Sequence, residues 1–143
     1  MYLQQKQITL KSENTLFKSV QIKDSEDAVN TALQFYHDDI QLYESAFIIM
    51  LNTQNNSTAY AKISQGGICG TVVDIRIICK YAIDSLASGI IFIHNHPGGS
   101  TEPSENDIKI TIKLQKALEL IDVVLHDSII ITKTSYKSIK FKP

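Results

Sequence analysis

Long apolar runs are absent from this sequence. No stretch approaches the roughly 18 apolar residues that a membrane-spanning helix requires, and the N-terminus lacks the charged-then-apolar pattern of a secretory signal. Internal repeats and low-complexity tracts are absent as well. We therefore exclude membrane-spanning and repeat architectures and expect a cytoplasmic protein.

An excess of positive charge and a cysteine framework are also missing. The formal net charge is −1, so no basic face is evident that would bind the phosphates of nucleic acid. Cys69 and Cys79 have neither a zinc-binding spacing nor a disulfide context, and we expect small buried or near-surface side chains at both positions. A mild basic bias near the end of the chain is interpreted as a solvated edge, and it comes from Lys133, Lys137, Lys140 and Lys142.

The remaining composition is typical of one globular domain. The chain has 143 residues, of which 43% are hydrophobic and 20% are charged. This length suffices for a hydrophobic core without disulfide or metal crosslinks. We predict a single domain over residues 1–143, with an N-terminal strand or extension at 1–24 and the core at 25–143.

Hydrophobic periodicity predicts alternating strands and helices. Three segments carry apolar residues at the spacing of one helix face, and we expect helices there: 25–38, 73–87 and 104–121. Short apolar or alternating segments predict strands at 6–10, 46–52, 58–64, 89–94, 123–132 and 136–141. The glycines Gly66, Gly67 and Gly70 predict a tight bend. Because helices flank the strands on both sides, we predict an α/β fold of the three-layer α+β type.

The segment after the predicted strand at 89–94 concentrates metal-binding side chains. Five residues define it: His94, His96, Pro97, Ser104 and Asp107. Five such identities at fixed spacings occur by chance in a chain of this length with a probability of roughly 10⁻⁴. In a strand, residues i and i+2 point to the same face, so His94 and His96 can bind one ion while Asn95 points away. Two histidines and the carboxylate of Asp107, with a fourth position left open, form the ligand set of a catalytic zinc site.

Each element of this motif also has a purely structural interpretation. The pattern Ser-x-x-Asp before a periodic segment is close to a capping box, in which Ser104 would cap the helix. Asp107 alone would be a carboxylate that compensates the helix dipole, and two histidines in a strand can be ordinary polar residues. Their coincidence at one strand-to-helix junction favours the metal site. The tripeptide His-Asn-His does not indicate an HNH nuclease, because the residues that name that family are dispersed over a ββα finger.

The spacing of these residues resembles the motif of the JAMM (JAB/MPN-type) metalloproteases, which is His-x-His-Pro, six residues, Ser, two residues and Asp. The letters His-Asn-His-Pro-Gly-Gly at 94–99 and Pro-Ser-x-x-Asp-Ile at 103–108 narrow the resemblance to the RadC branch. Supporting matches extend over about two thirds of the chain and include Glu44 before 47–51, the segment 63–71, and Asp127 before 129–132. The resemblance implies a curved mixed sheet sandwiched by helices, the JAB/MPN (cytidine-deaminase-like) architecture, with a metal at the edge of the sheet.

The resemblance also implies roles for individual residues. His94, His96 and Asp107 would bind Zn²⁺, Glu44 would be the catalytic glutamate, and Ser104 would stabilise the oxyanion. General chemistry agrees with these roles, because zinc in such a site lowers the pKa of a water molecule toward about 7. A glutamate is then needed to take the proton and pass it to the leaving amine. The residues alone do not select Glu44 for this task.

The sequence departs from the RadC pattern near the predicted strand at 123–132. RadC-type sequences commonly carry Asp-His there, whereas this chain has Asp127-Ser128, with His126 one place earlier. A histidine shifted by one residue in a strand faces the other side of the sheet, so we expect altered support of the metal ligands. We interpret His126 and His37 as ordinary polar histidines, and Glu105 as a solvated carboxylate in the first helical turn.

Three functions follow from these observations, and we favour the first. It is a zinc-dependent hydrolase, a metallopeptidase or isopeptidase that acts on a peptide or protein substrate. The second is a DNA-repair-associated RadC-type protein or nuclease, which predicts a basic stripe or stacking aromatics. The sequence shows neither of these features, nor the helix-hairpin-helix-like region of full-length RadC proteins. The third is a non-catalytic interaction scaffold.

Two further properties stay open at the level of sequence. Zinc suits two imidazoles and one carboxylate, but iron and manganese accept the same ligand types. The apolar late strands could pair across a homodimer.

Overall fold

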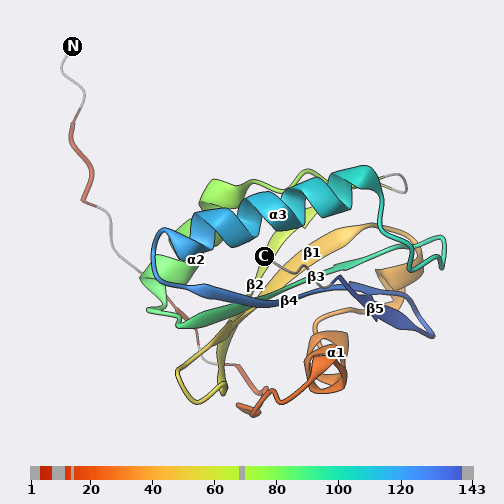
Figure 1. Ribbon diagram of the computed structural model, residues 1–143, viewed down its shortest axis with the longest axis horizontal. Coiled ribbons are helices and arrows are strands. Elements are labelled where there is room, and N and C mark those ends of the chain that lie inside the picture. The colour runs from red at the N-terminus through yellow and green to blue at the C-terminus, as the bar shows by residue number, and fades with distance from the viewer. Residues whose placement is uncertain (1–3, 8–11, 14, 68–69, 140–143) are drawn as a thin grey trace.

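A five-stranded mixed sheet forms the centre of the molecule (Figure 1). The computed structural model describes residues 4–7, 12–13, 15–67 and 70–139. The strands lie in the order β2-β1-β3-β4-β5, in which only β3 and β4 pair in parallel. Their bounds are Ser45–Leu51 (β1), Ser57–Gln65 (β2), Gly89–Asn95 (β3), Val124–Ile131 (β4) and Tyr136–Ser138 (β5).

Helices cover both faces of this sheet. Helix α1 (Ser25–Leu33) packs on one face, whereas α2 (Ile75–Asp84) and α3 (Glu105–Glu119) pack on the other (Figure 1). A short 3₁₀ helix, η1 (Asp38–Gln41), leads toward β1. Within the described residues, no helix combines the length and hydropathy that crossing a bilayer requires. The predicted α/β fold, with a mixed sheet between helices, is confirmed.

Alternation along β1 and β3 distributes their side chains between two hydrophobic cores. Every residue of both strands is buried. In β3, Ile91 and Ile93 join the core beneath α1, whereas Ile90 and Phe92 join the core beneath α2 and α3. A fully buried isoleucine contributes about 1.5–3 kcal/mol, so a one-residue slip of β3 would disrupt both cores. The same alternation places the side chain of His94 on the face covered by α3 and the side chain of Asn95 on the opposite face.

A buried stripe on α3 directs the first turn of this helix toward the sheet. Thr111, Leu114 and Leu118 are buried along the stripe and recur at the spacing of one helix face. Asp107 lies one turn before Thr111, whose hydroxyl donates to the Asp107 backbone oxygen at 2.9 Å. Asp107 therefore extends this stripe to the end of β3.

Some predicted elements differ from the structure. The helix predicted at 25–38 ends at Leu33, because the apolar residues Phe35 and Tyr36 pack against the sheet from an irregular segment. The Tyr36 hydroxyl donates to the backbone oxygen of Ser45 at 2.8 Å, which turns the chain back toward β1. Of the strand predicted at 6–10, residues 6 and 7 lie in neither helix nor strand and residues 8–10 lie outside the described residues. The strand predicted at 136–141 ends at Ser138, and residues 140–141 lie outside the described residues. The other boundaries agree within a few residues.

Candidate metal centre

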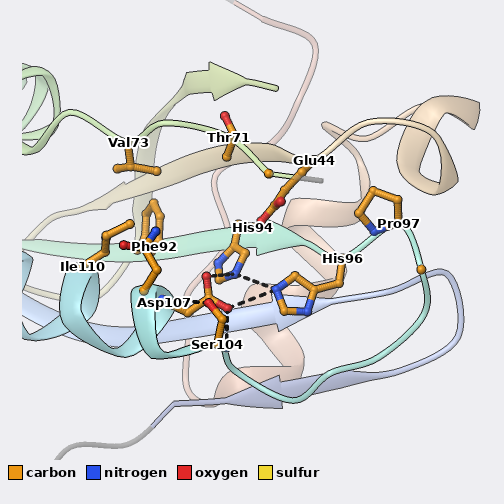
Figure 2. Close-up of a pocket in the computed structure, with 13 residues that line it drawn as sticks. Glu44, Thr71, Val73, Phe92, His94, His96, Pro97, Ser104, Asp107 and Ile110 are labelled. Carbon is orange, nitrogen blue, oxygen red and sulfur yellow. Dashed lines mark hydrogen bonds and ion pairs between the residues drawn. The ribbon is translucent and has the colours of Figure 1, made fainter. Parts of the chain in front are cut away.

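Three elements converge at one edge of the sheet to form the candidate site. Because β3 ends at Asn95, His94 belongs to the strand and His96 follows it directly. Asp107 lies in the first turn of α3, and Glu44 directly precedes β1. Figure 2 shows these histidine and carboxylate side chains converging on one pocket, which has a volume of about 370 Å³.

The two imidazole nitrogens and the two carboxylate oxygens of Asp107 lie at nearly equal separations. The Nε2 atoms of His94 and His96 are 3.2 Å apart. Asp107 Oδ1 lies 3.2 Å from His94 Nε2, and Asp107 Oδ2 lies 3.2 Å from His96 Nε2. The edge of a tetrahedron with zinc–ligand bonds near 2.0–2.1 Å is about 3.3 Å. Together with Glu44 these residues form a group, with ligand atoms within 4.8 Å of one another, that could bind a metal ion.

Hydrogen bonding orients the ring of His96 for such a role. Its Nδ1 lies 2.8 Å from the backbone oxygen of Ser100, and since a carbonyl only accepts, Nδ1 carries the proton. The Nε2 atom of His96 is then free to bind a cation. His94 is buried, and its Nδ1 has no hydrogen-bond partner among the described residues. This ring also directs Nε2 into the group, so both imidazoles present the same atom.

Ser104 and Asp107 form a complete capping box at the start of α3. Ser104 Oγ accepts the Asp107 N–H at 3.1 Å, and Asp107 Oδ2 accepts the Ser104 N–H at 2.9 Å. The capping interpretation is therefore confirmed. The Ser104 hydroxyl keeps its own proton to donate, and this residue lines the pocket beside the ligands (Figure 2).

The same contacts keep Asp107 ionised. Partial burial alone would raise the pKa of Asp107, but the hydrogen bonds from His94 and from the Ser104 backbone outweigh it. The pKa of Asp107 consequently lies well below its ordinary value. Asp107 therefore carries a negative charge at neutral pH, which suits the binding of a divalent cation.

Strand register explains the position of Glu44. Ala46 of β1 pairs with His94 of β3 in the antiparallel ladder, and Glu44 precedes Ala46 by two residues. It therefore points to the same face as His94 and lies close to His96. Burial raises the pKa of Glu44, the two histidines oppose this effect, and Asp107 adds to it. Neither histidine is ion-paired with Glu44 in the described part of the chain, so the Glu44 carboxylate belongs to the group but is not paired with either imidazole.

A glycine-rich loop holds the backbone of Glu44 and closes one side of the pocket. The Glu44 N–H donates to Gly67 O at 3.1 Å, and Gly66 N–H donates to Glu44 O at 2.8 Å. A Cβ on Gly66 would lie 1.8 Å from Gly70 O, so only glycine permits this close approach. Gly67 and Gly70 form an isolated antiparallel bridge, which agrees with the bend predicted at Gly66, Gly67 and Gly70, and Cys69 lies outside the described residues.

An apolar wall adjoins the ligands. Val73, Phe92 and Ile110 line the pocket on the side away from Pro97 (Figure 2). Phe92 precedes His94 by two residues in β3, and their ring centroids are 5.7 Å apart. The pocket therefore combines a charged edge that could bind a metal ion with an apolar surface that can hold a hydrocarbon group.

Sequence reasoning missed the contribution of Asn95. The prediction that its side chain points away from the histidines is confirmed, but the contacts on that side were not foreseen. Asn95 is completely buried, and its Nδ2 donates to the backbone oxygens of Ile40 and Tyr43 at 2.7 and 2.8 Å. Its Oδ1 accepts the Ser45 N–H at 2.7 Å. The available signal was an amide at the end of an apolar strand, since a buried amide requires partners.

His37, His126 and Glu105 lie outside the candidate group, in agreement with their interpretation as ordinary polar residues. His37 and His126 are exposed, outside the metal-binding group, and Glu105 is an exposed residue of the first turn of α3. Ser128 is buried, and its hydroxyl lies 2.9 Å from that of Thr111. Because Thr111 donates its only hydroxyl proton to the Asp107 backbone oxygen, Ser128 donates to Thr111. Position 128 thus supports the start of α3 through a hydroxyl pair.

Comparison with known proteins agrees with this geometry. Residues 22–142 match the family described as RadC-like JAB domain. A UPF0758 protein of Flavobacterium johnsoniae is 42% identical over 96 residues, which cover 67% of this chain and 42% of that protein. A UPF0758 protein of Neisseria meningitidis serogroup C is 40% identical over 114 residues, which cover 80% of this chain and 50% of that protein. The chain spans about half the length of the curated relatives it matches. From the site and from this match, the chain belongs to the RadC-like JAB domain family.

Proposed function

We propose that this protein is a zinc-dependent hydrolase of the JAMM type that cleaves a peptide or isopeptide bond. The observation that carries the proposal is the cluster of His94, His96 and Asp107, in which the two Nε2 atoms lie 3.2 Å apart and each lies 3.2 Å from one carboxylate oxygen. A further carboxylate, that of Glu44, belongs to the same group and lines the same pocket. Three protein ligands with a position left for substrate or water distinguish a catalytic site from a structural one.

The residues present fit a zinc ion. Two imidazole nitrogens and one carboxylate are a common donor set for Zn²⁺, and the separations suit its tetrahedral geometry. Bound zinc activates a water molecule and polarises a carbonyl group. Ligand type alone also admits iron or manganese, so metal content has to be measured.

Glu44 supplies the proton transfers that hydrolysis requires. It accepts a proton from the attacking water, whose oxygen forms a bond to the carbonyl carbon of the substrate. When the carbon–nitrogen bond breaks, Glu44 returns this proton to the leaving amine. Burial raises the pKa of Glu44, which brings this carboxyl group closer to the range in which it can both accept and donate.

Ser104 provides a donor for the charge that develops on the carbonyl oxygen. Its Oγ accepts one hydrogen bond, from the Asp107 N–H at 3.1 Å, which fixes the oxygen and leaves the hydroxyl proton available. A donor held in this way stabilises an oxyanion without reorganising. The apolar wall of Val73, Phe92 and Ile110 can accommodate a hydrocarbon side chain of a peptide or protein substrate.

Metal content and hydrolysis test the proposal together. We expect about one zinc ion per wild-type chain, and loss of zinc in His96→Ala and Asp107→Asn. Asp24→Ala is the matched control, because Asp24 caps α1 through Asp27 N–H at 2.9 Å and lies outside the pocket. Glu44→Gln should keep zinc and lose hydrolysis of peptide and isopeptide panels. Metal content that is indifferent to the ligand substitutions would overturn the proposal and leave a non-catalytic scaffold.

A further inference from the structure

We propose that Asn95 is the positioning residue for Glu44, and that its buried amide sets the distance between this carboxylate and the metal ligands. The proposal deepens the hydrolase function, because the role of Glu44 rests on that function. Asn95 touches neither the pocket nor the ligand atoms. It acts through the backbone that carries Glu44.

The hydrogen bonds of Asn95 enclose Glu44 from both sides along the chain. Its amide nitrogen binds Tyr43 O, immediately before Glu44, at 2.8 Å. Its amide oxygen binds Ser45 N, immediately after Glu44, at 2.7 Å. The second amide proton binds Ile40 O of η1 at 2.7 Å. One side chain thus fixes the segment that leads from η1 into β1.

This attachment matters because the Glu44 side chain has no hydrogen bond of its own within the described residues. Its place in the pocket follows from its backbone, which the 66–67 loop holds on one side and Asn95 holds on the other. Asn95 lies between the two histidines in sequence, and strand alternation sends its side chain to the opposite face. The three consecutive residues 94–96 therefore fix both the ligands and the glutamate that serves them.

Substitutions at Asn95 are compared with a matched asparagine at the other end of β1. Asn95→Ala removes all three hydrogen bonds. If the alanine variant does not fold, Asn95→Ser is used instead, because its hydroxyl can still form a hydrogen bond. The control is Asn52→Ala, which removes bonds from the Gln54 and Asn56 N–H groups, both 3.0 Å long and remote from the pocket. Folding is checked by circular dichroism and zinc affinity by calorimetry.

The kinetic readout is kcat against KM for a hydrolysed peptide. We expect Asn95→Ala to keep its zinc affinity, because this side chain belongs neither to the ligand group nor to the pocket lining, and to lose about 10- to 100-fold in kcat with little change in KM. Combining it with Glu44→Gln should cause no further loss beyond Glu44→Gln alone, since both changes act on one group. Losses that multiply in the double variant, or an equal loss in Asn52→Ala, would overturn the proposal.

A crystallographic readout separates this inference from the hydrolase function. If the zinc-loaded wild type cleaves no peptide or isopeptide, the function fails, but the position of Glu44 can still be compared in crystals of wild type and Asn95→Ala. Displacement of the Glu44 carboxylate away from His94, His96 and Asp107 supports the positioning role. An unchanged position of the Glu44 carboxylate in the variant would overturn that role.

Discussion

Asp107 serves both the helix and the candidate metal site, and two substitutions separate these roles. Its Oδ2 accepts the Ser104 N–H at 2.9 Å, while its two oxygens each lie 3.2 Å from a histidine Nε2. Asp107→Asn keeps an oxygen for the Ser104 N–H, whereas Asp107→Ala removes it. Because both variants lose the negative charge, the difference in stability between them isolates the cap.

The magnitude follows from one capping hydrogen bond. We expect metal-free Asp107→Ala to be less stable than metal-free Asp107→Asn by about 1 kcal/mol, or about 4 °C in Tm for a domain of this size. Zinc affinity should behave differently and fall in both variants by more than about 100-fold. This estimate is a lower bound, because even residues that only support a ligand are worth about 10- to 100-fold.

Two measurements on the same proteins check this separation. Urea unfolding of chelator-treated samples gives the free energy of unfolding, and calorimetric titration gives the zinc affinity. An asparagine variant with wild-type zinc affinity would refute Asp107 as a ligand. Equal stability of the two variants would refute the contribution of the cap.

Four further outcomes are expected. Gly66→Ala places a Cβ 1.8 Å from Gly70 O and should lower stability by about 1–3 kcal/mol in thermal unfolding, whereas Gly67→Ala, with nothing within 4 Å, should change it little. Ile110→Glu places a charge on the apolar wall, so peptide profiling should show lost preference for apolar side chains next to the cleaved bond; an unchanged profile would exclude this wall as a substrate contact. Chelation should reduce the stability of wild type by about 2.7 kcal/mol when free zinc had been 100-fold above Kd, and should not affect Asp107→Asn. Burial raises the pKa of Tyr36 well above its ordinary value, so the unfolded chain releases this proton first; stability should be complete below about pH 10 and decline above it, and unfolding at several pH values should show no such decline in Tyr36→Phe.

Local patterns in the sequence were sufficient to predict that His94, His96 and Asp107 converge as candidate metal ligands. Two histidines at i and i+2 share a face in any strand, and a carboxylate in the first turn of the following helix returns to the strand end. Both relations involve neighbouring residues, so they need no knowledge of the tertiary fold. The same holds for the α/β class, which followed from segments of helix and strand periodicity.

Glu44 could not be selected by this kind of reasoning. It lies fifty residues before His94, and only the pairing of Ala46 with His94 brings it to the site. The register of two strands that are distant in sequence depends on tertiary packing, which hydrophobic periodicity does not encode. The resemblance to JAMM proteases supplied this residue, because a family motif carries tertiary information implicitly.

Helix length failed for a related reason. Phe35 and Tyr36 continue the apolar spacing of α1, so the helix predicted at 25–38 was too long. Both residues are instead core contacts of a connecting segment, and the Tyr36 hydroxyl binds Ser45 O. An apolar residue in a sequence indicates that its side chain is buried. Whether its backbone is helical depends on the tertiary contacts that the side chain makes.

The capping box and the metal-ligand interpretation of Asp107 are not alternatives. A carboxylate has two oxygens with about four acceptor sites, so Oδ2 can accept the Ser104 N–H while both oxygens remain directed at the histidines. The cap also restricts the carboxylate to one orientation before any cation binds, and a ligand held by its surroundings needs less ordering on binding. The cap therefore already holds Asp107 in the position, facing both histidines, that a metal ligand requires. The helix-capping role of Asp107 is therefore an argument for its suitability as a metal ligand.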